Sequence, residues 1–179
     1  LCADTALQPL LKHKILPDGV FIEEAQNVIK KAFLGTSRAD FRLFAGLSSI
    51  PELSEYIDIS KISYFSSLYT NANYLENLNK KNLLPYQNMP FGSVGITTMY
   101  YATKFRKDDS VPIFYYGLDF SYSAGYTHTR NTIAHIERLC KSNRINKVEN
   151  YNAAFSATSI KLSKDNSCFS TPVLLNYKN

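Results

Sequence analysis

The sequence predicts an α/β protein with a Rossmann-like, mostly parallel sheet flanked by helices and a partly helical insertion. Short apolar runs alternate along the chain with segments whose apolar residues recur at helical spacing. Turns rich in Gly, Pro and Asp separate the two kinds of segment. This alternation is typical of a parallel sheet with helices on its faces.

The first part of the chain carries the pattern most clearly. We expect a helix over residues 5–14, with Asp4 as its cap, and a buried strand over residues 20–22. A second helix is expected over residues 25–34 and a second strand over residues 41–45.

Residues 48–89 interrupt this regularity, and we interpret them as an insertion or lid. The segment contains a short helix candidate after Pro51, a strand candidate over residues 62–65 and an Asn-rich stretch that we expect to be helical near residues 74–82. Regular patterning returns at Ser93.

From Ser93 to residue 105 the chain is apolar nearly all round, which predicts a buried helix. Residues 111–117 are β-branched and aromatic and form the most strand-like run of the protein. An amphipathic helix is expected over residues 131–140.

Composition limits the classes of function. Of the 179 residues, 45% are hydrophobic and 20% charged, which suits one globular domain over residues 1–179, one that we expect to lack its N-terminal elements. There is no apolar run long enough for a transmembrane helix. The formal charge is +5, but Lys and Arg are scattered, so we expect no nucleic-acid partner. The three Cys are far apart, which favours reduced thiols and a cytoplasmic protein. The oligomeric state is not indicated.

Ligands of parallel sheets bind at the carboxyl ends of the strands, and three places in this sequence fall there. At Gly92 and Ser93 a helix start could offer N–H groups to an anion, or it could be an ordinary capped helix. Glu23 follows a predicted strand, although acids also favour the start of a helix.

The third place is the loop from Gly117 to Arg130, after the most strand-like run. His128 could act as general acid or base, Asp119 could orient a hydroxyl or hold a metal, and Arg130 could bind a phosphate or carboxylate. An ordinary polar loop is the alternative. His135 is expected at the surface of its helix, and no set of metal ligands is predicted.

Motifs for common NTPases, zinc proteases, serine hydrolases and dinucleotide oxidoreductases are absent from the sequence. Instead, three blocks in order resemble the domain shared by bacterial motility accessory factors and archaeal 6-hydroxymethylpterin diphosphokinases. They are Cys2–Asp18, a helix start that includes Gly92, Ser93, Val94 and Thr97, and the stretch with Gly117, Asp119, Tyr122, Gly125, Thr127 and His128.

The sequence departs from this family at three points. Glu23 or Glu24 stands where the family has an Asp, and Phe91 replaces a glycine. The family's Gly-Pro-Ser loop would precede Leu1.

The resemblance implies a Rossmann-like fold related to bacterial sialyltransferases. For the bacterial proteins it implies transfer of a sialic-acid-like nonulosonic acid from a CMP donor to a protein or glycan hydroxyl, with no added cofactor. For the archaeal proteins it implies pyrophosphoryl transfer from ATP to a pterin alcohol, with Mg²⁺. A non-catalytic nucleotide- or glycan-binding module is a third possibility.

Under this resemblance, His128 would be the acid or base and Asp119 would hold a ribose, a sugar hydroxyl or a metal. The expected substrate- and nucleotide-binding residues are Glu23, Gly92, Ser93, Thr97, Gly117, Tyr122, Thr127 and Arg130. We favour sugar transfer because the Tyr-rich strand and loop suit stacking on sugars and bases.

Overall fold

The computed structural model describes residues 1–37, 39–67, 72–123, 126, 128–145, 160–162 and 168–178. The chain divides into two compact units, Leu1–Asp108 (unit 1) and Asp109–Asn179 (unit 2). The single domain over residues 1–179 stays a prediction.

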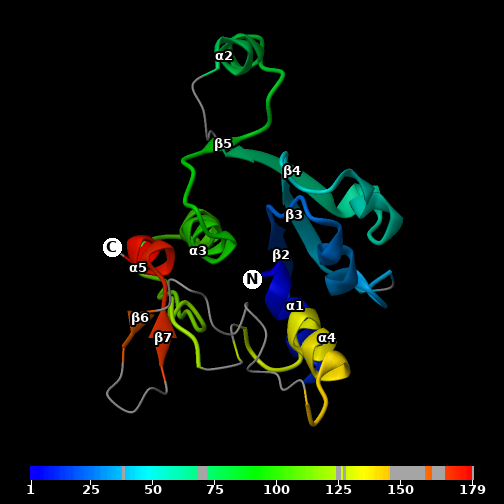
Figure 1. Ribbon diagram of the computed structural model, residues 1–179. Helices are drawn as coiled ribbons and strands as arrows, with labels where there is room; N and C mark the ends of the chain where they lie inside the picture. Colours follow the sequence, from blue (N-terminus) through cyan, green and yellow to red (C-terminus); the bar gives the residue numbers. More distant parts are fainter. Residues whose placement is uncertain are drawn as a thin grey trace. The chain divides into compact units, whose positions relative to one another are not determined.

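Unit 1 contains a five-stranded parallel sheet with the strand order β1-β2-β3-β4-β5 (Figure 1). Its strands are β1 (Cys2–Ala3), β2 (Gly19–Ile22), β3 (Arg42–Gly46), β4 (Ile62–Ser67) and β5 (Gln87–Asn88). The predicted fold class, an α/β Rossmann-like parallel sheet flanked by helices, is therefore confirmed. The strands predicted near residues 20–22, 41–45 and 62–65 all belong to this sheet.

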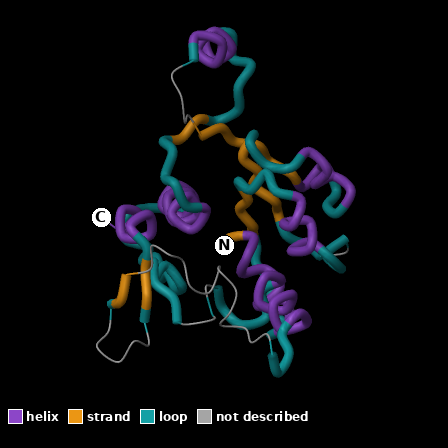
Figure 2. Tube along the Cα trace, in the orientation of Figure 1, coloured by secondary structure: helices purple, strands orange, loops and turns teal. Residues whose placement is uncertain are grey.

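The connections between the strands are helical (Figure 2). In chain order they are α1 (Asp4–Lys12), the 3₁₀ helices η1 (Asn27–Phe33), η2 (Pro51–Glu55) and η3 (Ile59–Lys61), and α2 (Asn73–Lys80). A further helix, α3 (Val94–Phe105), follows β5. The helix predicted over residues 25–34 is a 3₁₀ helix, in which Ile29, Ala32 and Phe33 are buried. Gly35 follows it with a φ of +74°, a conformation that favours glycine.

The two faces of the sheet carry different cores because successive side chains of a strand point to opposite faces. On one face, Val20, Ile22 and Leu43 pack with Leu7 of α1 and Phe33 of η1. A hydrogen bond from Gln8 Nε2 to the carbonyl oxygen of Ala32 (2.8 Å) ties α1 to η1.

On the other face, aromatic side chains pack against α3. The rings of Phe21 and Phe44 are stacked with centroids 4.6 Å apart, and Tyr101 of α3 lies 5.1 Å from Phe21 and 5.2 Å from Phe65. Only Thr97 and Tyr101 of α3 are buried, while Met99 and Phe105 are exposed. The prediction of a helix buried all round is therefore wrong, because one face alone packs on the sheet.

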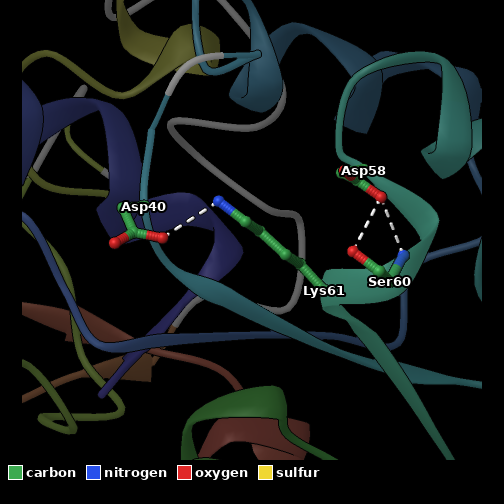
Figure 3. Close-up of polar contacts among 4 residues, drawn as sticks. All are labelled: Asp40, Asp58, Ser60 and Lys61. Carbon is green, nitrogen blue, oxygen red and sulfur yellow. Dashed lines mark hydrogen bonds and ion pairs between the residues drawn. The ribbon is translucent and has the colours of Figure 1, made fainter.

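Polar side chains just before β3 and β4 form an ion pair and local hydrogen bonds (Figure 3). Lys61 Nζ pairs with Asp40 Oδ1 at 2.9 Å, and Asp58 Oδ1 accepts hydrogen bonds from the amide and hydroxyl of Ser60. The Asp40 side chain is 88% exposed, so this ion pair is expected to contribute about 0–1 kcal/mol to stability.

The range expected as an insertion or lid supplies two strands of the sheet, β4 and β5. Between them α2 stands away from the sheet (Figure 1), and none of its residues is buried. The helix predicted near residues 74–82 is thus present, but it adds nothing to the core of unit 1.

Unit 2 has little regular structure in its described part. It contains α4 (Ile133–Lys141), α5 (Pro172–Lys178) and an antiparallel pair, β6 (Ile160–Lys161) with β7 (Phe169–Ser170). Residues 111–117 form no strand, and Phe114, Tyr115 and Tyr116 are 79%, 64% and 91% exposed. The strand prediction is wrong because β-propensity reflects packing against neighbouring strands, which this run lacks in the described structure.

We predict that Phe21→Ala lowers the free energy of unfolding by about 3–5 kcal/mol, because it empties a site shared by three aromatic rings. Urea denaturation followed by circular dichroism measures this change. Phe114→Ala is the control, since the same substitution at an exposed position should alter stability by less than about 0.5 kcal/mol. Equal losses in the two variants would contradict the assignment of the core.

Candidate functional site

The carboxyl ends of the parallel strands place polar side chains at one edge of unit 1. Glu23 follows β2, Ser67 is the last residue of β4 and Asn88 is the last residue of β5. Ligands of open parallel sheets bind outside this edge. The residues that gather here are therefore the first candidates for a binding site.

Glu23 is the centre of this group. Its Oε1 accepts a hydrogen bond from the hydroxyl of Ser67, and its Oε2 accepts one from Thr97 Oγ1 of α3 at 2.8 Å. Thr97 is fully buried, whereas Glu23 is half-buried. An ionised carboxylate has about four acceptor positions. The described residues use two of them, which leaves two for the hydroxyl groups of a ligand.

Asn88 extends the group toward α3. Its Nδ2 donates to Ser67 Oγ at 3.1 Å and to the carbonyl of Met89 at 2.7 Å, while its Oδ1 accepts from the hydroxyl of Tyr101 at 3.3 Å. Burial raises the pKa of Tyr101, and the neighbouring Tyr86, Tyr100 and Glu23 add to the shift, so the hydroxyl keeps its proton and donates. Donors and acceptors thus alternate from Tyr101 to Glu23, and this order fixes the orientation of the carboxylate. We call Glu23, Ser67, Asn88, Thr97 and Tyr101 the edge network.

The start of α3 is joined to the edge network. Gly92 has a φ of +72° and turns the chain into Ser93, the extended residue that precedes the helix. The carbonyl of Ser93 accepts the N–H of Thr97 at 3.0 Å. It also lies 3.2 Å from Thr97 Oγ1, whose single proton is donated to Glu23 over the shorter distance. The side chain of Ser93 makes no capping bond. The structure therefore brings together four of the predicted residues, Gly92, Ser93, Thr97 and Glu23.

Asp4 lies at the same edge, directly after β1. It is 3% exposed, and its Oδ1 accepts the N–H of Thr5 at 2.6 Å. Burial raises its pKa to about 7, and the charges of Glu24 and Glu23 contribute to the rise. The sequence suggested a capping role for Asp4. The structure instead makes it the first residue of α1, with a carboxyl group that holds a proton near neutral pH.

The remaining predicted residues belong to unit 2. Asp119 and Gly117 are exposed, and Gly117 has a φ of +82°. Asp119 makes no hydrogen bond or ion pair with another described residue. Tyr122 is 7% exposed and pairs with Phe169 through two backbone hydrogen bonds of 2.8 Å, so its ring serves the packing of unit 2. Thr127 lies outside the described residues.

His128 and Arg130 are exposed side chains of the loop before α4. Partial desolvation of its imidazole lowers the pKa of His128, and the charge of Arg138 lowers it further. Arg130 lies over the ring of Tyr126, with 5.6 Å from its guanidinium carbon to the ring centroid. His135 was expected at the surface, but it is 7% exposed and that prediction is wrong.

Three members of the edge network were not predicted, namely Ser67, Asn88 and Tyr101. Ser67 could have been found as the polar end of a strand-like run. Asn88 lies in a two-residue strand that has no hydrophobic pattern, so no local signal marks it. Tyr101 is one of two adjacent Tyr on α3, and only its position four residues after Thr97 distinguishes it from Tyr100.

Within the described part of the chain, no group of three or more His, Cys, Asp or Glu side chains is placed to hold a metal ion. No helix there is long and apolar enough to span a membrane.

No family model and no solved structure matches the chain significantly. An uncharacterized protein of Treponema pallidum (strain Nichols) is similar, with 36% identity over 142 residues that make up 79% of this chain. The match covers 24% of that relative, so the chain spans less than a third of the relative's length.

We predict that Thr97→Val lowers the free energy of unfolding by about 1.5–3 kcal/mol, because a buried bond to a carboxylate is lost without a change of shape. Thermal unfolding measures the effect. Thr98→Val is the control, since the hydroxyl of Thr98 donates only to the carbonyl of Val94 in its own helix. An equal, small effect of both substitutions would show that Thr97 does not hold Glu23.

The raised pKa of Asp4 predicts a pH-dependent stability. Between its ordinary value of 3.8 and about 7, the unfolded chain releases the proton that the folded chain retains. The folded state therefore loses stability as pH rises through this window. Asp4→Asn removes the effect and should be more stable than the unsubstituted protein at pH 8, by on the order of a few kcal/mol, with little difference near pH 3.5.

Urea denaturation at the two pH values tests this expectation. Asp58→Asn is the matched control. Hydrogen bonds from the amide and hydroxyl of Ser60 lower the pKa of Asp58. Replacing this ionised carboxylate by an amide should therefore destabilise rather than stabilise the protein at pH 8. A difference between Asp4→Asn and the unsubstituted protein that is constant with pH would be inconsistent with a protonated Asp4.

Proposed function

We propose that this chain is part of a transferase that moves a sialic-acid-like nonulosonic acid from a CMP donor to a hydroxyl acceptor. One observation carries the proposal. The Glu23 carboxylate is held at the end of β2 by Ser67 and Thr97, keeps unused acceptor positions and is joined through Thr97 to the start of α3. In nucleotide-binding α/β folds, an acidic side chain after a strand accepts the hydroxyls of the ribose, while a helix start receives phosphate.

The proposed roles follow from these positions. Glu23 accepts ribose or sugar hydroxyls, and Ser93 with the first N–H groups of α3 binds the phosphate or carboxylate of the donor. Gly92 supports this role, since a positive φ at that position directs the chain into the helix start.

The resemblance supplies the roles in unit 2. His128 takes the proton of the acceptor hydroxyl, or gives a proton to the departing phosphate, while Asp119 holds a sugar hydroxyl. The acceptor oxygen bonds to the anomeric carbon, the bond between that carbon and the phosphate oxygen breaks, and CMP leaves. The lowered pKa of His128 favours a neutral imidazole at pH 7, which is the form that can accept a proton.

Calorimetric titration of the protein with CMP tests the donor site. We expect Glu23→Gln to weaken CMP binding about tenfold or more, because an amide has fewer acceptor positions and its NH₂ opposes the donors of Ser67 and Thr97. Glu24→Gln is the control, since the Glu24 side chain accepts only the local N–H of Gln26 among the described residues. This variant should bind CMP normally.

The outcomes separate the possible functions. Binding of ATP with Mg²⁺ but not of CMP would replace sugar transfer with the pterin diphosphokinase function. Failure to bind either nucleotide would contradict both enzymes and leave a glycan-binding module. Equal CMP affinity of the two Glu variants would remove Glu23 from the site.

A further inference from the structure

Two groups that can carry positive charge lie against one aromatic ring in unit 2. The guanidinium carbon of Arg130 is 5.6 Å from the centroid of the Tyr126 ring, and the ring of His135 is 5.3 Å from the same centroid. Stacking on an aromatic ring holds a guanidinium in place while leaving its N–H groups available in the plane. Tyr126 therefore fixes the position of Arg130 relative to His135.

His135 has one satisfied and one unsatisfied ring nitrogen. Its Nδ1 accepts the backbone N–H of Asn131 at 3.2 Å, which in the neutral ring places the proton on Nε2. His135 is 7% exposed, and its Nε2 is buried with no hydrogen-bond partner. A buried donor without an acceptor is unfavourable. The fold thus positions an N–H group that a ligand oxygen would satisfy.

Positive charge surrounds this donor. Burial lowers the pKa of His135, and the charges of Arg130 and Arg138 lower it further. Arg138 follows His135 by three residues on α4 and so shares its side of the helix. Arg138 also acts on His128. The two arginine charges disfavour the protonated form of His135, and an anion among these groups would offset that effect.

The start of α4 adds to the same potential. Thr132 precedes the helix and its Oγ1 accepts the N–H of His135 at 3.3 Å, which puts His135 in the first turn. The N-terminal end of a helix carries partial positive charge. The helix dipole, two guanidinium groups and a fixed imidazole N–H therefore favour negative charge in one place.

We propose that Arg130, His135 and Arg138 form a binding site for the phosphate group of a phosphate monoester, with His135 Nε2 donating to a phosphate oxygen. Phosphate is favoured over carboxylate because it carries more charge at pH 7 and offers three acceptor oxygens to donors from different residues. The site stands on unit 2 alone and does not rest on the proposed sugar transfer.

Titration with inorganic phosphate, followed by NMR of the imidazole groups, tests the proposal at constant ionic strength. We expect saturable shifts of the His135 signals and a rise of its pKa toward the usual range, because the bound anion offsets the charges of Arg130 and Arg138. Sodium acetate is the comparison. Equal binding of acetate would overturn the assignment to phosphate, and unchanged His135 signals would overturn the site.

Substitutions separate the site from general surface charge. Arg138→Gln should weaken phosphate binding about tenfold, whereas Arg144→Gln removes the same charge from an exposed position of unit 2 and should have little effect. Equal loss in both variants would reduce the site to non-specific attraction.

At His135 the two substitutions His135→Gln and His135→Leu should differ. Gln can present an N–H near the position of Nε2 and should keep most of the affinity, while Leu should abolish it. Thermal unfolding without phosphate shows whether His135→Leu still folds. A folded Leu variant with normal phosphate affinity would contradict the role of His135.

Discussion

The packing of Tyr101 against Phe21 and Phe65 is the contact on which the candidate site of unit 1 depends. It packs α3 on the face of the sheet opposite α1. The other contacts between α3 and the carboxyl edge depend on this placement. Thr97 lies one helical turn before Tyr101, so docking the Tyr101 ring also sets the Thr97 hydroxyl on Glu23. The Tyr101 hydroxyl reaches Asn88 from the same ring. Apolar packing therefore sets the geometry of a polar group.

Much of unit 1 could be predicted from the sequence because β2 and most of β3 are continuous apolar runs. Val20, Phe21 and Ile22 are all fully buried, and a strand covered on both faces has that pattern. Residues 111–117 are also rich in β-branched and aromatic side chains, but they form no strand. A strand needs a neighbour as well as propensity, and the neighbour of a parallel strand is distant in sequence. Local pattern therefore cannot decide between a strand and an exposed aromatic run.

The candidate site was predictable only in part, for a related reason. Glu23 stands next to a recognisable strand, and Thr97 was carried by the family resemblance. Asn88 and Ser67 acquire their importance from pairing between β4 and β5, which no local pattern shows. His135 was wrongly predicted to be exposed, because it occupies a helical position beside charged residues. The turn at Asn131 and the ring of Tyr126 instead enclose its imidazole.

The position of α2 away from the sheet has a thermodynamic consequence. The chain leaves the sheet after Ser67 and returns at Gln87, so pairing β5 with β4 must offset the entropy lost in closing that excursion. Only two residue pairs make this closure, Ser66 with Gln87 and Ser67 with Asn88, while α2 contributes no burial. The side-chain hydrogen bonds of Asn88 therefore also help to hold β5 against β4. Under the proposed function, ligand binding at Glu23 and local opening of residues 72–86 would be coupled equilibria, because a ligand that rigidifies the edge network would suppress that opening.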